Sequence, residues 1–169
     1  MDNQVIYSIN KNLEAIPFVE IIHPYTHRFL DDFEIKLSDG VKEKLHLELV
    51  KELSALAEII LQQALDSFIL AGNDQMESFI TKMNQSLAED FSVLDSMIKK
   101  KVSDFSHHIY NILNRFNKDY ENIKAIFNLN EVKIVDVDAN LGDGHNGEGT
   151  ALIYLSNGTK LVYKPRNVN

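Results

Sequence analysis

The 169-residue sequence contains no cysteine, three prolines and only seven glycines. Without cysteine there is no disulfide framework, which fits a reducing compartment, and no thiolate that could bind zinc. No stretch reaches eighteen consecutive apolar residues, and residues 1–4 lack the basic region of a signal peptide. We therefore expect a cytoplasmic protein without a membrane span.

Basic residues are also scarce, since 17 Lys and Arg stand against 25 Asp and Glu and give a net charge of -8. A general nucleic-acid partner would need a basic face, so the charge argues against one. The single basic run, Lys99-Lys100-Lys101, lies within a helical pattern. It is interpreted as a solvated face, with a docking site for an acidic peptide as the alternative.

Residues 1–40 show no clear periodicity and are interrupted by Pro17 and Pro24, which predicts an irregular N-terminal segment. His23 and His27 are four residues apart, a spacing that suits a metal site on one helix face. Pro24 between them makes a continuous helix unfavourable, so the spacing is more simply a coincidence.

Residues 41–128 are predicted to form a helical module. Its first helix begins after Asp39, is hydrophobic around most of its surface and is therefore expected to be largely buried, and it ends near Gly72. Asp74 and Glu77 resemble a capping box that opens a second helix.

A third helix is predicted by the cleanest apolar stripe in the chain, and residues 117–127 are predicted to form a fourth, short helix. His107 and His108 flank the stripe and are expected at the surface or at its boundary. The stripe consists of Leu94, Met97, Ile98, Val102, Phe105, Ile109, Ile112, Leu113 and Phe116.

Five of the seven glycines lie between Gly142 and Gly158, where the backbone must turn sharply or approach a ligand closely. Gly142, Gly144 and Gly147 form the pattern G-x-G-x-x-G. This pattern occurs both in dinucleotide-binding folds and in kinase-type loops, so the residues around it must distinguish the two.

The residues that follow favour the kinase-type arrangement. Residues 150–155 are rich in β-formers, whereas a dinucleotide-binding fold needs a helix there. Asn157-Gly158 predicts a type I′ hairpin turn, and residues 159–163 the return strand that carries Lys164 at its end. With a first strand over residues 131–137, the predicted order is strand, glycine loop, strand, tight turn, strand and lysine.

A kinase-type phosphate site is built in this order, because a glycine hairpin covers the phosphates and a lysine on the third strand reaches them. Glycines let backbone N–H groups approach phosphate oxygens, and the lysine adds a compact positive charge. The simpler interpretation is a long hairpin loop made by the three glycines, with Lys164 as a solvated lysine and His145 as an ordinary loop residue.

A calcium site is a further alternative, since Asp136, Asp138 and Asn140 occupy positions one, three and five of an EF-hand-like loop. Leu141 stands at position six instead of glycine, and Gly147 at position twelve instead of glutamate. The sequence therefore disfavours calcium.

The run from Leu141 to Gly147, the hairpin, and the ending Tyr163-Lys164-Pro165-Arg166 resemble the dehydratase domain of type 2 (LanM-type) lanthipeptide synthetases, which make lantibiotics. The resemblance implies a lipid-kinase-like domain that phosphorylates Ser and Thr of a precursor peptide with ATP and Mg. The same domain then eliminates the phosphate to leave dehydroamino acids.

Carried over by position, Lys164 resembles the family's nucleotide-phosphate lysine. Asp143 and His145 resemble the acid and the histidine of its glycine-rich loop, acting in phosphorylation, elimination or both. The resemblance also makes Gly142, Gly144 and Gly147 part of the nucleotide site. Arg166 matches the family motif without an assigned role.

We therefore expect an α+β fold in which the helical N-terminal module precedes a three-stranded antiparallel unit over residues 129–169, resembling the start of a kinase-like small lobe. The family's catalytic-loop and magnesium-binding acids are expected beyond residue 169. This predicts an N-terminal fragment of the dehydratase domain with little activity alone, unless a separate chain completes it. The alternatives are a non-catalytic module that binds a peptide or partner, and a truncated relic gene product.

Overall fold

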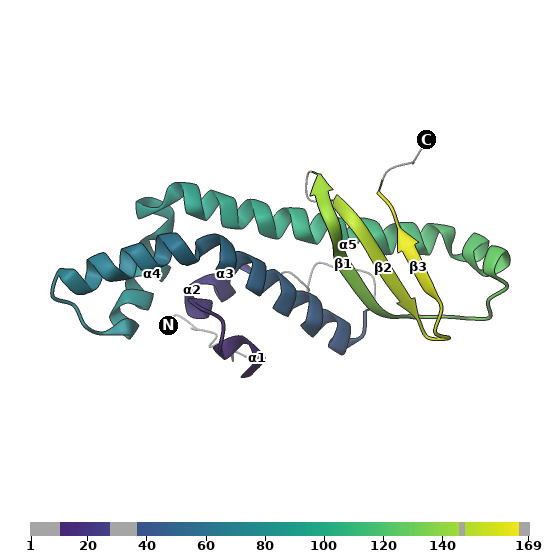
Figure 1. Cartoon of the computed structure of the whole chain (residues 1–169), viewed down its shortest axis with the longest axis horizontal. Coiled ribbons are helices and arrows are strands. Elements are labelled where there is room, and N and C mark those ends of the chain that lie inside the picture. The colour runs from purple at the N-terminus through teal and green to yellow at the C-terminus, as the bar shows by residue number, and fades with distance from the viewer. Residues whose placement is uncertain (1–10, 28–36, 146–147, 166–169) are drawn as a thin grey trace, which may run out of the picture. The chain divides into compact units, whose positions relative to one another are not determined.

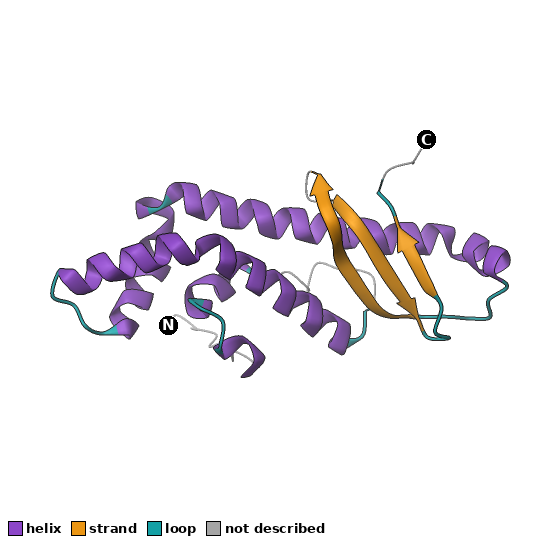
Figure 2. Cartoon of the chain, viewed as in Figure 1, coloured by secondary structure: helices purple, strands orange, loops and turns teal. Residues whose placement is uncertain are grey.

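The computed structural model describes residues 11–27, 37–145 and 148–165. Helices come first along the chain and strands last (Figures 1 and 2). The elements are α1 (Lys11–Glu14), α2 (Val19–Ile22), the 3-10 helix η1 (His23–Tyr25), α3 (Asp39–Leu70), α4 (Met76–Asp90), α5 (Ser92–Phe127), β1 (Ile134–His145), β2 (Glu148–Leu155) and β3 (Lys160–Tyr163). This order and the antiparallel sheet confirm the predicted α+β class.

The chain divides into two compact units. The first contains residues 1–27 and 47–98, and the second contains residues 28–46 and 99–169. Helices α3 and α5 each contribute residues to both units.

The first unit is built around a core of aliphatic side chains and one aromatic ring. Phe79 of α4 is fully buried, and its ring centroid lies 6.4 Å from that of Phe18 and 5.6 Å from that of Phe68. Apolar residues of α2, α3 and α4 complete this core: Val19, Ile21, Ile22, Leu49, Val50, Leu53, Ala57, Leu61, Met83 and Leu87.

The N-terminal segment is attached to this unit by hydrogen bonds that combine side chains and backbone. Phe18 has a φ of 56°, a left-handed conformation that is unfavourable for a bulky residue. The Ser54 hydroxyl on α3 donates at 2.8 Å to the carbonyl of Pro17, the residue before Phe18. The Tyr25 hydroxyl donates to Asp95 at 2.7 Å. These contacts offset the unfavourable backbone conformation and fix the segment.

Two helices end at residues with a left-handed backbone, as the sequence suggests, but the N-cap of one helix differs from the predicted residue. Gly72 has a φ of 93° after α3, and Asn128 has a φ of 50° after α5, as expected for left-handed C-terminal caps. The N-cap of α4 is Gln75, one residue after the predicted cap, and it makes no side-chain cap hydrogen bond. Asp74 is therefore not the cap.

Two other predictions about the helices are wrong. Residues 117–127 do not form a separate fourth helix, because α5 continues without interruption from Ser92 to Phe127. Helix α3 is also less buried than expected, since Ile59, Ile69 and Leu70 are 71%, 51% and 88% exposed. By length and composition α3 is apolar enough to cross a membrane, a test that core helices of soluble proteins also pass.

The second unit contains the sheet, whose strand order is β1-β2-β3 with both pairs antiparallel. Val137 pairs with Ile153, and Ala151 pairs with Tyr163, so these buried residues share one face of the sheet. Helix α5 crosses behind the strands in Figure 1, and its His108 hydrogen-bonds to Ala139 of β1. The outer edge of the short strand β3 has no strand partner among the described residues.

The predicted hairpin at Asn157-Gly158 is present, but its turn differs from the expected type I′. Gly158 has a φ of 85°, whereas Asn157 does not have a positive φ. The Gly158 amide donates to Leu155, and the Leu155 amide donates to Thr159, both at 2.9 Å. This is the three-residue loop in which a type I turn is followed by a left-handed glycine, so only one residue needs positive φ.

We predict that Ser54→Ala destabilises the protein by about 1 kcal/mol, because the Pro17 carbonyl, next to the unfavourable Phe18 conformation, loses the hydrogen bond from the buried Ser54 hydroxyl. Urea unfolding followed by circular dichroism measures the change. Ser67→Ala is the matched control, since Ser67 is exposed on the same helix and bonds only its own turn, at the Gln63 carbonyl. Equal losses in the two variants would contradict a special role for Ser54.

Candidate functional site

The glycine segment is part of a long β-hairpin and is not the open loop that the sequence predicted. Strand β1 begins at Ile134, later than expected, and its backbone continues through Gly142 and Gly144 to His145. His145 pairs directly with Glu148 of β2. Gly147 lies outside the described residues.

The pairing of β1 with β2 is irregular where the glycines begin. Its register shifts between Asp138 and Leu141 and again between Leu141 and His145. Glycine inside a strand typically marks such bulges or a close approach of another group to the backbone. Cross-strand hydrogen bonds therefore fix this end of the hairpin less strictly than the regular pairing of Val137 with Ile153.

The remaining site residues predicted from the sequence are only partly described. Asp143 and His145 belong to β1 by their backbone, and their side chains lie outside the described part of the chain. Lys164 directly follows β3, and its side chain is exposed. Arg166 lies outside the described residues. The structure thus provides the backbone frame of the predicted site and the position of its lysine.

The sheet face opposite the buried residues carries exposed apolar side chains. Leu141 is 41% exposed and Val162 is 59% exposed. Leu152 of β2 pairs with Asp138 on one side and with Val162 on the other, so these side chains share the outer face. Lys160 belongs to the same face of β3, two residues before Val162. This outer face combines an apolar surface with lysines.

One edge of the outer face is held by an ion-pair cluster that the sequence did not indicate. Lys44 Nζ of α3 lies 2.9 Å from Asp136 and 2.6 Å from Asp138. The Tyr154 hydroxyl donates to the second oxygen of Asp138 at 2.8 Å. The two carboxylates that suggested a calcium loop are therefore alternate residues of a strand, and an ammonium group lies between them.

The charges of this cluster support one another. Burial lowers the pKa of Lys44, but the hydrogen bonds and charges of Asp138 and Asp136 outweigh it and raise the pKa to about 12. The hydrogen bonds from Lys44 and Tyr154 lower the pKa of Asp138. The Tyr154 pKa is raised because its hydroxyl hydrogen-bonds to that carboxylate. Both charged partners are thus favoured in the folded state.

Behind the sheet, two polar residues of α5 bind β1 and β2, and a third binds the residue that directly follows β3. His108 Nε2 donates to the Ala139 carbonyl of β1 at 2.9 Å, and the Asn111 amide donates to the Glu148 carboxylate of β2 at 2.7 Å. Arg115 donates to the Lys164 carbonyl at 3.3 Å. The prediction that His108 lies at the surface or boundary is wrong, because it is 1% exposed.

Tyr163 of β3 lies among these α5 side chains. The Arg115 guanidinium carbon is 5.5 Å from the Tyr163 ring centroid, and the His108 ring meets the same ring edge-on at 6.2 Å. Burial raises the Tyr163 pKa, the charge of Arg115 opposes this, and the charge of Glu148 adds to it. The residue before Lys164 is therefore packed between a cation and an aromatic ring.

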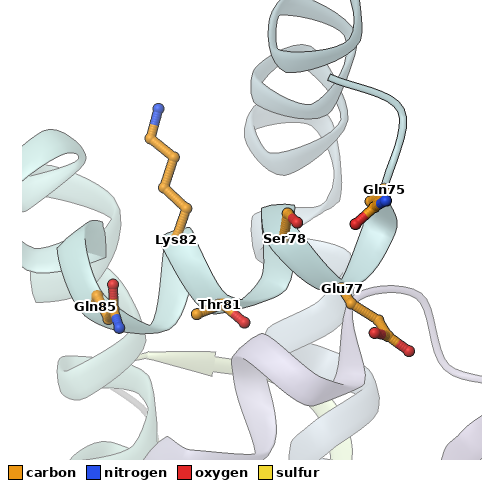
Figure 3. A pocket seen from close by; sticks show the side chains of 6 residues that line it. All are labelled: Gln75, Glu77, Ser78, Thr81, Lys82 and Gln85. Atoms are coloured by element: carbon orange, nitrogen blue, oxygen red, sulfur yellow. The ribbon is translucent and has the colours of Figure 1, made fainter.

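A separate hollow of about 410 Å³ lies along α4 and is lined by Gln75, Glu77, Ser78, Thr81, Lys82 and Gln85 (Figure 3). All six side chains are exposed and come from one helix and its N-cap. Binding pockets usually combine an apolar wall with a few desolvated polar groups. The hollow lacks that combination and is a weaker candidate than the sheet.

Residues 91–169 match a protein family described as Domain of unknown function (DUF4135). This domain is found in LanM-type lanthipeptide synthetases. The matched residues include all of α5 and the three strands, and therefore the glycine segment and Lys164. A comparison with curated proteins found no match.

We predict that Lys44→Met lowers the free energy of unfolding by about 1 kcal/mol near pH 7, since a third of each charged side chain still contacts water. Asp138 has a lowered pKa in the folded state, so its contribution is complete above its unfolded value of 3.8 and is lost as pH falls below it. The raised pKa of Lys44 keeps its own contribution complete below 10.5.

The difference between wild type and Lys44→Met is therefore expected to be constant from about pH 5 to 9 and to shrink below about pH 4. Urea unfolding across this range measures it. Lys42→Met removes the same charge from the same helix without contacting the two carboxylates, and it serves as the control. A difference that does not shrink at all as pH falls from 4 toward 2 would contradict the assigned ion pairs.

Proposed function

We propose that this chain supplies the nucleotide-contacting strands of a lantibiotic-forming lanthipeptide dehydratase, an enzyme that phosphorylates Ser and Thr of a precursor peptide with ATP and then eliminates the phosphate. The observation that carries the proposal is the order of elements on one antiparallel sheet. A glycine-rich strand end, a return strand, a tight turn and a third strand are followed by Lys164. The family match over the same residues supports it.

The outer face of the sheet has the chemistry that a nucleoside triphosphate requires. Leu152 and Val162 lie side by side across β2 and β3 and offer an apolar surface to a base. Lys164 is exposed two residues beyond Val162, where a positive charge can meet phosphate oxygens. Gly142 and Gly144 leave the backbone of β1 open to close approach by phosphates.

Magnesium is proposed to accompany the nucleotide without being held by this segment. No cluster of three His, Cys, Asp or Glu suited to a metal occurs in the described part of the chain. Asp136 and Asp138 are already bound by Lys44. We therefore assign to the chain the binding of the base and the phosphates, and to Asp143 and His145 a role in phosphorylation or elimination.

Titration calorimetry with Mg-ATP tests the proposal. We expect saturable binding by the wild-type chain and a loss of about tenfold or more in Lys164→Ala, which is the cost of one hydrogen bond to a charged group. Lys160→Ala is the matched control, because Lys160 is an exposed lysine on the same strand whose Nζ lies 5.4 Å from the Tyr154 ring centroid. Its affinity for Mg-ATP should stay close to that of wild type.

Two outcomes would overturn the assignment. Equal losses in the two lysine variants would remove Lys164 from a specific phosphate site. Saturable binding of a Ser/Thr-rich precursor peptide without any binding of ATP would favour the alternative, a non-catalytic peptide-binding module.

A further inference from the structure

Helix α5 presents a polar row to the back of the sheet within an otherwise apolar stripe. His108, Asn111 and Arg115 are spaced by three and four residues, so they lie along one side of the helix. Around them the buried residues Phe105, Ile109, Ile112, Leu113 and Phe116 supply the hydrophobic contact. His108 is buried, Asn111 is half-buried and Arg115 is exposed, so His108 is the member of the row whose polarity hydrophobic packing does not explain.

Each member of the row binds a different segment next to the proposed nucleotide site, namely β1, β2 and the residue directly after β3. His108 binds the Ala139 carbonyl, three residues before Gly142. Asn111 binds Glu148, the residue after Gly147. Arg115 binds the backbone of Lys164 itself and covers the ring of Tyr163. The row therefore contacts both strands of the glycine hairpin and the base of the lysine, all from behind.

These contacts occur where the sheet is least able to define its own geometry. The register of β1 against β2 shifts twice between Asp138 and His145, and β3 ends one residue before Lys164. Strand pairing alone leaves the glycine end and the lysine loosely specified. A helix that binds β1, β2 and the residue directly after β3 at this level supplies the missing constraint.

His108 shows that this arrangement has an energetic cost. Its Nε2 donates to Ala139, but its Nδ1 is buried and has no hydrogen-bond partner among the residues that the structure describes. A buried polar atom without a partner is unfavourable, and a leucine of similar size would avoid this. The hydrogen bond to the Ala139 carbonyl is what the histidine provides and a leucine does not.

We infer that His108, Asn111 and Arg115 are positioning residues that hold the glycine hairpin and Lys164 in the geometry that binds the triphosphate, without touching the nucleotide. The inference rests on the proposed function, since it concerns the same site. It assigns to α5 the alignment of the phosphate-binding groups. It therefore predicts that changes in the polar row lower the affinity for the triphosphate and leave the affinity for the nucleoside almost unchanged.

The test compares Mg-ATP with adenosine by titration calorimetry on the whole chain. Arg115→Ala is expected to weaken ATP binding by about three- to tenfold and adenosine binding by less than about twofold, because only the phosphate-contacting groups shift. Lys118→Ala, which removes an exposed charge one turn further along α5, should leave both affinities unchanged.

Two additional variants separate positioning from general loss of structure. In a Lys164→Ala background, Arg115→Ala should cause little further loss of ATP affinity, because both act through the same group. His108→Gln places an amide donor near the original Nε2 and should retain more ATP affinity than His108→Leu. Asn111→Ala should behave like Arg115→Ala.

The outcomes distinguish this inference from the proposed function. If wild type binds ATP and Lys164→Ala does not, but Arg115→Ala and Asn111→Ala bind like wild type or lose ATP and adenosine equally, the positioning role is overturned while the function stands. If wild type binds no ATP, both are overturned. Selective loss of ATP affinity, non-additive with Lys164→Ala, supports the inference.

Discussion

The second unit depends on the packing of α5 against one face of a three-stranded sheet. A sheet of this size is only marginally stable unless one face is covered. Ala139, Ile153 and Tyr163 face the buried side, and α5 supplies the aliphatic side chains that exclude water there. The same helix hydrogen-bonds to β1, to β2 and to Lys164 directly after β3, so hydrophobic burial and alignment of the strands come from one element.

Much of this architecture can be predicted from local sequence signals. Gly72, Asn128 and Gly158 end or turn the chain where their tolerance of positive φ predicts. The β-forming residues 150–155 and the turn at Asn157-Gly158 identify the two later strands. These signals succeed because each depends on a few neighbouring residues whose backbone preferences are not overridden by distant contacts.

Other features could not be predicted because they depend on partners far away in the sequence. Lys44 is more than ninety residues from Asp136, and nothing near either residue indicates the ion pair. The division at Asn117 fails because one weak helix former does not end a helix whose apolar face is packed. The burial of His108 could have been predicted from the sequence, since it lies three residues after Phe105 and four before Ile112. The helical spacing places it on the buried stripe, although its polarity suggests the surface.

The short strand β3 forms an edge of the sheet, and its side chains bear on how the protein avoids self-association. An unpaired edge that carries apolar residues such as Val162 is a template for pairing with another chain. Lysines at positions 160 and 164 bracket that residue, and charge repulsion between copies would oppose edge-to-edge contact. Under the proposed function, Lys164 would serve solubility as well as phosphate binding, and colloidal behaviour and affinity would be linked through a single side chain.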